Sequence, residues 1–147
     1  MKKSGDLKRC IKSANEFLSI ALYCREKQKE SKFELNPPLF VNGALACELY
    51  MKAIIMSESP DSTYDSIHRL QELFHKLDIE TQRIIENNYN QNVKQISLQD
   101  FLIKYNNNFV EWRYSFEDGT CGHPIAIIGF AESLQKYARG ISDGEIR

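Results

Sequence analysis

Residues 39–56 constrain the fold more than any other part of the chain, because they are apolar on nearly every side of a helix. A helix without a polar face has to be buried, so this segment predicts the central helix of a bundle. Asn42, Glu48 and Lys52 interrupt the apolar run. A membrane-spanning helix needs about 20 predominantly apolar residues. We therefore expect a soluble protein that does not associate with a membrane.

Apolar residues recur with the period of a helix in most of the remaining chain. Long helices are predicted over residues 6–29, 39–57, 97–117 and 124–141, short helices over residues 66–77 and 78–86, and loops over residues 57–65 and 87–95. No segment alternates between apolar and polar residues for long enough to predict a strand. The sequence therefore predicts an all-α bundle of four main helices with one or two short extra helices. A single helical bundle domain, residues 1–147, is expected for this length.

Residues at the predicted helix ends support these boundaries. Ser97 is the expected N-cap of its helix, with Asp100 three residues later in a variant of the capping box. Pro38 is placed near the first turn of the central helix, where its missing N–H costs nothing. His123 is the expected N-cap before Pro124, which begins the last helix.

The charge balance gives no reason to expect a polyanionic partner bound through bulk charge. The chain has 19 Lys and Arg against 20 Asp and Glu, a net charge of −1 at pH 7. Any nucleic-acid site would therefore have to be a local basic patch.

The spacing of cysteine and histidine predicts neither a disulfide nor a metal site. None of the four cysteines forms a Cys-x-x-Cys pair, and free thiols indicate a reducing cytoplasm. No apolar N-terminal stretch resembles a signal peptide, so a cytoplasmic location is expected. His68 and His75 lie two helical turns apart, too far to share a metal. Cys121 and His123 have no further Cys or His nearby, whereas zinc needs at least three protein ligands. We expect no metal and no cofactor.

Glu48 and Lys52 are the charged residues within the predicted central helix, and their spacing of four places them on one face. Charges on a buried helix must be paired, or they destabilise the fold strongly. We expect a structural ion pair. The functional alternative is a polar pocket between this helix and the helix over residues 97–117.

Arg113 and Glu117 also lie four apart, in the stretch Trp-Arg-Tyr-Ser-Phe-Glu, where aromatic residues flank the cation. An arginine edged by aromatic rings can stack on a base or clamp a phosphate. The alternative is an arginine that pairs with Glu48 or Glu117 and holds the bundle in register. The two interpretations differ in whether one side of the guanidinium is open to solvent.

Three stretches together resemble the HEPN superfamily of small helical bundles. Residues 40–55 resemble its central helix, a run of small residues followed by Glu-Leu-x-x-Lys-Ala. Residues 67–77 are similar to its His-Asp-Leu-x-x-Leu-Phe-x-x-Leu segment, with Arg69 in place of the aspartate. Residues 109–117 are similar to the helix with the functional arginine of the family, which Arg113 matches.

The resemblance implies a homodimer with a metal-independent ribonuclease site, in a toxin–antitoxin or phage-defence system of prokaryotes. Each subunit of such proteins contributes an arginine and, after four to six further residues, a histidine. Here carboxylates follow Arg113 in place of the histidine, and His123 lies too far along the chain. A general acid or base would have to be Glu117 or His68. Other members are inactive and bind RNA, nucleotides or a partner protein.

The leading hypothesis is a HEPN-like domain that binds RNA or a nucleotide, with degenerate or atypical endoribonuclease activity. Arg113 would hold a phosphate, Glu117 or His68 would transfer a proton, and Glu48 with Lys52 would orient the arginine. Whether the protein is an enzyme stays open.

Alternatively, the chain is a non-catalytic interaction or dimerisation module with a cognate protein partner. The same polar residues would then fix the helix register, and an exposed apolar patch would bind the partner. A helical pyrophosphatase that uses magnesium is a weaker alternative, because the sequence has no Glu-x-x-Glu cluster.

Overall fold

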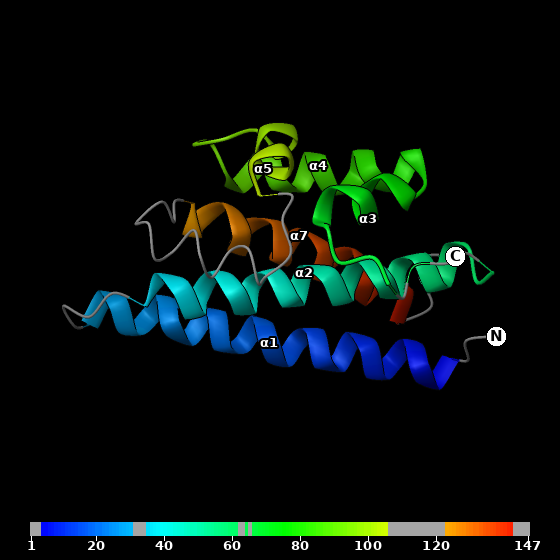
Figure 1. Ribbon diagram of the computed structural model, residues 1–147, viewed down its shortest axis with the longest axis horizontal. Helices are drawn as coiled ribbons and strands as arrows, with labels where there is room; N and C mark the ends of the chain where they lie inside the picture. The colour runs from blue at the N-terminus through cyan, green and yellow to red at the C-terminus, as the bar shows by residue number, and fades with distance from the viewer. Residues whose placement is uncertain (1–3, 31–34, 62–63, 65, 106–122, 143–147) are drawn as a thin grey trace.

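The computed structural model describes residues 4–30, 35–61, 64, 66–105 and 123–142 of the chain. Within these ranges the chain forms six α-helices and no strand, which confirms the predicted all-α class (Figure 1). The helices are α1 (Ser4–Glu30), α2 (Asn36–Glu58), α3 (Leu70–Lys76), α4 (Ile79–Asn92), α5 (Leu98–Lys104) and α7 (Pro124–Ser142).

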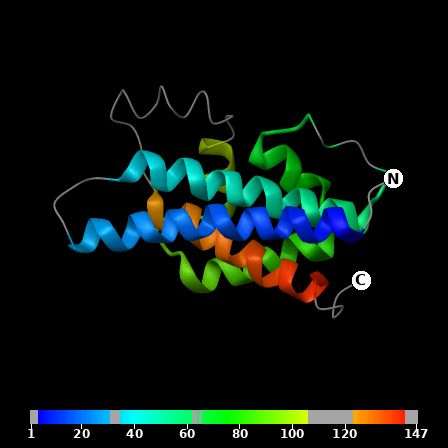
Figure 2. The ribbon, with the colours of Figure 1, turned by 90° about the horizontal axis from the view of Figure 1, so that it is seen from below.

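α2 lies at the centre of this arrangement, as its apolar sequence predicts. α1 packs along α2 over most of its length, and α7 packs on α2 from another direction (Figure 2). α3, α4 and α5 form a layer on the side away from α1, with α3 in contact with α2 (Figure 1). The buried residues of α2 occupy most of its circumference, and Val41, Leu45 and Lys52 lie on one stripe that is half-buried.

Aromatic side chains join the layer of short helices to α7. Phe130 of α7 contacts Phe74 of α3 and Phe101 of α5, with ring centroids 6.0 Å apart in both pairs. Tyr89 of α4 packs edge-on against Phe130 at 6.5 Å. All four rings are fully buried. Because each aromatic pair adds about 0.5–1.5 kcal/mol beyond its buried area, this cluster anchors the short helices.

The predicted loop over residues 87–95 is wrong in its first part, because α4 continues through Asn92. Thr81, Ile85 and Tyr89 are buried at a spacing of four, so one narrow face packs on the core. Most of the Asn and Gln side chains on the remaining faces are exposed. The Tyr89 hydroxyl donates to the carbonyl of Ile96 at 2.8 Å and ties the following turn to the helix. A helix that buries so few residues looks like a loop in composition.

The predicted N-cap of α5 is confirmed, since Ser97 Oγ accepts the backbone N–H of Asp100 at 3.1 Å. α5 ends at Lys104, with Tyr105 as its C-cap. Residues 106–122 lie outside the described residues, so the long helix predicted over residues 97–117 is described only in its first part.

Two helices begin at places other than those predicted. α2 begins at Asn36, earlier than expected, and has proline in its first turn, where no intrahelical donor is needed. α3 begins at Leu70 rather than near residue 66. The preceding segment contains a turn, in which the Ile67 N–H donates to the carbonyl of Tyr64 at 3.0 Å.

By length and composition alone, α2 is apolar enough to cross a membrane, even with its three polar residues. A buried helix in the core of a soluble protein passes the same test, and most of this helix is buried against its neighbours. The property therefore gives only weak evidence about membranes in either direction.

Gly129 sets the distance between α7 and the end of α4, and its replacement tests this contact. A Cβ at this position would overlap Val93 Cγ2, and a β-branched side chain has little freedom to move away. We expect Gly129→Ala to destabilise the fold by about 1–3 kcal/mol, despite the higher helix propensity of alanine. Urea unfolding measures the change.

Val93→Ala provides the matched background for this test. With the valine methyls removed, Gly129→Ala should be neutral or stabilising, because only the helix-propensity gain of up to about 1 kcal/mol remains. An equal loss of stability in both backgrounds would show that the contact between Val93 and Gly129 does not limit the packing of α7.

Candidate functional site

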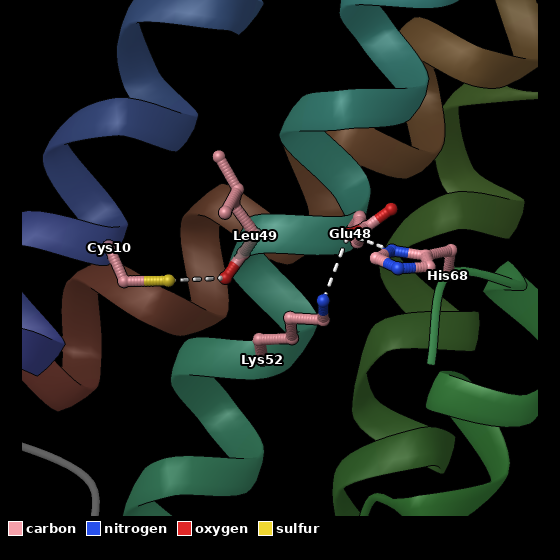
Figure 3. Close-up of polar contacts among 5 residues, drawn as sticks. All are labelled: Cys10, Glu48, Leu49, Lys52 and His68. Atoms are coloured by element: carbon pink, nitrogen blue, oxygen red, sulfur yellow. Dashed lines mark hydrogen bonds and ion pairs between the residues drawn. The ribbon is translucent and has the colours of Figure 1, made fainter. Parts of the chain in front are cut away.

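Glu48, Lys52 and His68 come together at one point on α2, and we call them the Glu48 cluster. Lys52 Nζ lies 2.9 Å from Glu48 Oε2, which confirms the expected ion pair (Figure 3). His68 Nδ1 lies 3.0 Å from the same carboxylate oxygen. One carboxylate oxygen therefore joins a lysine on its own helix to a histidine from the segment before α3.

The Glu48 cluster lies at the edge of the core rather than inside it. The side chains of Glu48 and Lys52 are each 12% exposed, whereas that of His68 is 50% exposed. A carboxylate so far withdrawn from water requires a partner, and it has two. His68 lies in non-helical chain just before Arg69, the N-cap of α3, and its ring points toward Glu48 of α2 (Figure 3).

The geometry at His68 defines a tautomer. An ionised carboxylate only accepts hydrogen bonds, so the proton of a neutral imidazole is placed on Nδ1. Nε2 is then an acceptor, and within the described ranges no residue hydrogen-bonds to it. A histidine oriented by a carboxylate through one nitrogen, with the other nitrogen accessible, can accept a proton from a bound molecule.

Arg113 and Glu117 lie outside the described residues. The structure therefore brings together three of the five candidate residues, and the contact expected between Glu48 and Arg113 stays a prediction.

The three cysteines of the described helices are free thiols. Cys10 Sγ donates to the carbonyl of Leu49 at 3.2 Å and links α1 to α2 (Figure 3). Cys10 is partly buried, and Cys24 and Cys47 are buried. Burial raises the pKa of both Cys24 and Cys47. Since the thiolate is the nucleophile, neither thiol is suited to covalent chemistry.

The remaining histidines are not part of the Glu48 cluster. His75 is exposed on α3. His123 precedes α7, and its carbonyl accepts the N–H of Ala126 at 3.0 Å, as expected at an N-cap. Its Nδ1 lies 2.8 Å from the hydroxyl of Tyr105. Among the described residues, no group of three or more His, Cys, Asp or Glu is arranged to hold a metal ion.

The contact between His68 and Glu48 is not predictable from the sequence pattern. The two residues are 20 positions apart, and His68 lies in non-helical chain, so no helical spacing relates them. A possible signal was the charge of Glu48 itself, because a carboxylate on a buried helix needs partners beyond one lysine.

No protein-family model, no curated protein and no solved structure matches this chain. The resemblance to the HEPN superfamily therefore depends on the three sequence stretches and stays an expectation.

Removal of Lys52 tests whether its ion pair with Glu48 stabilises the fold. We expect Lys52→Met to cost about 3 kcal/mol, the lower end for breaking a buried pair, because Glu48 would keep His68 as its one described partner. The double variant Glu48→Met/Lys52→Met should lose less than the sum of the single variants. Urea unfolding of the four proteins gives a coupling energy of about 1–3 kcal/mol, and a coupling near zero would contradict the pair.

The protonation of His123 should make the stability depend on pH. Burial, together with the ammonium of Lys104, lowers the pKa of His123 below its ordinary value of 6.5. The unfolded chain then binds this proton more readily than the folded chain. The contribution of neutral His123 to the free energy of unfolding is therefore fully present above about pH 6.5. It is lost as the pH falls through the lower pKa of the folded state.

We expect His123→Asn to reduce the loss of stability between neutral and acidic pH, measured by urea unfolding at both values. His75→Asn is the matched control at an exposed position. If the two variants had the same pH dependence as the wild type, His123 would not be the group that titrates.

Proposed function

We propose that this protein is a HEPN-like helical domain that binds RNA or a nucleotide, with the Glu48 cluster as part of its site. The observation that supports the proposal is His68, which is half exposed and oriented by a carboxylate that is mostly buried.

In this proposal the protein cleaves RNA without a metal. His68 Nε2 accepts the proton of a ribose 2′-hydroxyl, and the 2′-oxygen attacks the adjacent phosphorus. The bond to the 5′-oxygen of the next nucleotide breaks, and that oxygen takes a proton from the His68 imidazolium as it leaves, so the products are a 2′,3′-cyclic phosphate and a 5′-hydroxyl. Glu48 stabilises the imidazolium, Arg113 holds the phosphate, and Glu117 is the alternative proton donor.

The biological setting that we propose follows from the resemblance alone. It is a cytoplasmic homodimer with a cognate protein partner, in a toxin–antitoxin or defence system. An incomplete Arg-x4-6-His motif agrees with an atypical or degenerate endoribonuclease.

The experiment compares binding and cleavage of a labelled RNA pool by the wild type and by His68→Ala. A general base contributes about 10²–10⁴ in rate, so cleavage should fall by at least about a hundredfold while binding changes little. His75→Ala, on the exposed face of α3, is the matched control and should cleave like the wild type. Arg113→Ala should weaken binding as well as cleavage. Thermal melts of each variant exclude unfolding.

Equal cleavage by His68→Ala and His75→Ala would overturn the role of the Glu48 cluster. Binding without cleavage by the wild type would make the domain an RNA-binding protein in which catalysis has been lost.

A second candidate function is the non-catalytic interaction module, favoured by apolar side chains on the outer face of α1. Ile20 and Tyr23 lie one turn apart there and are 46% and 62% exposed. Exposed apolar side chains that lie together on one face are typical of surfaces that bind another protein. Failure of the wild type to bind RNA, together with a loss of stability in Arg113→Ala, would favour this candidate.

A further inference from the structure

A polar groove lies between the last turns of α4 and the second half of α7, which run side by side (Figure 2). Its volume is about 450 Å³. The two helices are antiparallel, since the oxygens of Thr81 and Tyr137 lie 3.0 Å apart at one end and Val93 faces Gly129 at the other. The polar lining includes Asn88, Gln91 and Asn92 of α4 and Glu132, Lys136 and Arg139 of α7.

The positive charges of this groove are not neutralised by the part of the chain that the structure describes. The four other described arginines, Arg9, Arg25, Arg69 and Arg83, each pair with a carboxylate one to three residues away. Within the same residues, Arg139 has no carboxylate within 4.0 Å, and neither has Lys136. Glu132 lies four residues before Lys136, a spacing that favours a helix ion pair, yet the two do not pair.

The spacing of the two cations suits a phosphate. Lys136 and Arg139 are three residues apart, so they lie on the same face of α7 and both line the groove. The guanidinium presents several donors in one plane, which matches the oxygens of a phosphate, and the ammonium adds a compact charge.

Carboxamides supply most of the remaining polar lining, and hydrogen bonds within the protein hold two of them. Gln135 also lines the groove, and its Nε2 donates to Asn15 Oδ1 at 3.1 Å. The Tyr50 hydroxyl donates to the same oxygen. Asn92 Nδ2 donates to the carbonyl of Asn88 at 3.2 Å. These bonds orient the amides of Gln135 and Asn92, whose oxygens can then accept hydrogen bonds from a ligand.

The lining distinguishes between classes of phosphorylated ligand. None of the described lining residues is aromatic, so a nucleobase would have no ring on which to stack. A carboxylate and several carboxamides are instead suited to the hydroxyl groups of a sugar. The volume is within the range of about 300–1,000 Å³ found for small-molecule sites.

We propose that the groove between α4 and α7 binds a sugar monophosphate. Arg139 and Lys136 hold the phosphate, and Glu132 with the carboxamides of Asn92 and Gln135 accepts hydrogen bonds from the hydroxyl groups. The groove shares no residue with the Glu48 cluster, so this site does not depend on the proposed RNA chemistry.

Isothermal titration with ribose 5-phosphate tests the site on the full chain. Arg139→Ala should raise Kd about tenfold or more, the loss of one charge-assisted contact. Arg83→Ala removes an exposed arginine of α4 that pairs with Glu80, and it should leave Kd unchanged. Thermal melts should be alike, because both arginines are exposed.

Glu132→Ala removes both the charge and the acceptor oxygens of Glu132, and it separates a role in binding from a purely structural role. Without the negative charge, inorganic phosphate should bind more tightly, whereas ribose 5-phosphate should bind more weakly because an acceptor for its hydroxyls is lost. Changes in the same direction for both compounds would overturn the role of Glu132 and with it the sugar half of the site.

Three outcomes would overturn the proposal as a whole. The first is no saturable binding of ribose 5-phosphate by the wild type. The second is adenosine 5′-monophosphate bound as tightly as ribose 5-phosphate or more tightly, which would make the ligand a nucleotide. The third is a 5′-phosphorylated oligoribonucleotide bound more tightly than ribose 5-phosphate through Arg139, which would make the groove part of an RNA surface.

Discussion

α1, α3 and α7 all pack against α2, so a polar side chain that this helix withdraws from water needs a hydrogen-bond partner. Asn42 donates to the carbonyl of Pro38 one turn earlier at 2.7 Å and so stays within its own helix. Glu48 accepts from both Lys52 and His68 and thereby holds the chain that leads into α3. Glu58, at the end of α2, accepts the N–H of Asp78 at 2.9 Å and so holds the start of α4. The few polar groups of an apolar helix therefore determine where the elements after it lie.

Close contacts between helices determine the position of α7 relative to α4, and so the two sides of the polar groove between them. Gly129 allows α7 to approach Val93, and Gly43 allows α2 to approach α7, where an added Cβ would lie 3.0 Å from Ile127 Cγ1. α7 is thus held tightly on its buried side, and the polar residues of its other face stand beside the last turns of α4. The Tyr50 hydroxyl, hydrogen-bonded through Asn15 to Gln135, fixes this wall against α1 and α2.

Much of the fold could be predicted from the sequence because the long helices bury wide apolar stripes. The periodicity of residues 6–29 and 124–141 corresponds to α1 and α7 within a few residues at each end. The end of α4 could not be predicted, because Thr81, Ile85 and Tyr89 bury one residue per turn among exposed Asn and Gln. Neither could the start of α3, since the apolar pattern that begins at Ile67 precedes the first helical residue, Leu70.

The candidate site was predictable only where a helix relates its residues. The spacing of Glu48 and Lys52 predicts their contact, but the contact with His68 depends on how the non-helical chain before α3 is placed beside α2.

The polar groove could not be predicted from the sequence for a different reason. Charges within an apolar segment are unusual in a sequence and indicate a site. Lys136 and Arg139 instead lie on an ordinary polar helix face, and Glu132 precedes Lys136 at the spacing of a helix ion pair. Both cations line a groove between two helices, a property that only three-dimensional structure can reveal. Among the residues that the structure describes, two cations without a carboxylate partner lie beside oriented amides, an arrangement that suits a ligand of opposite charge.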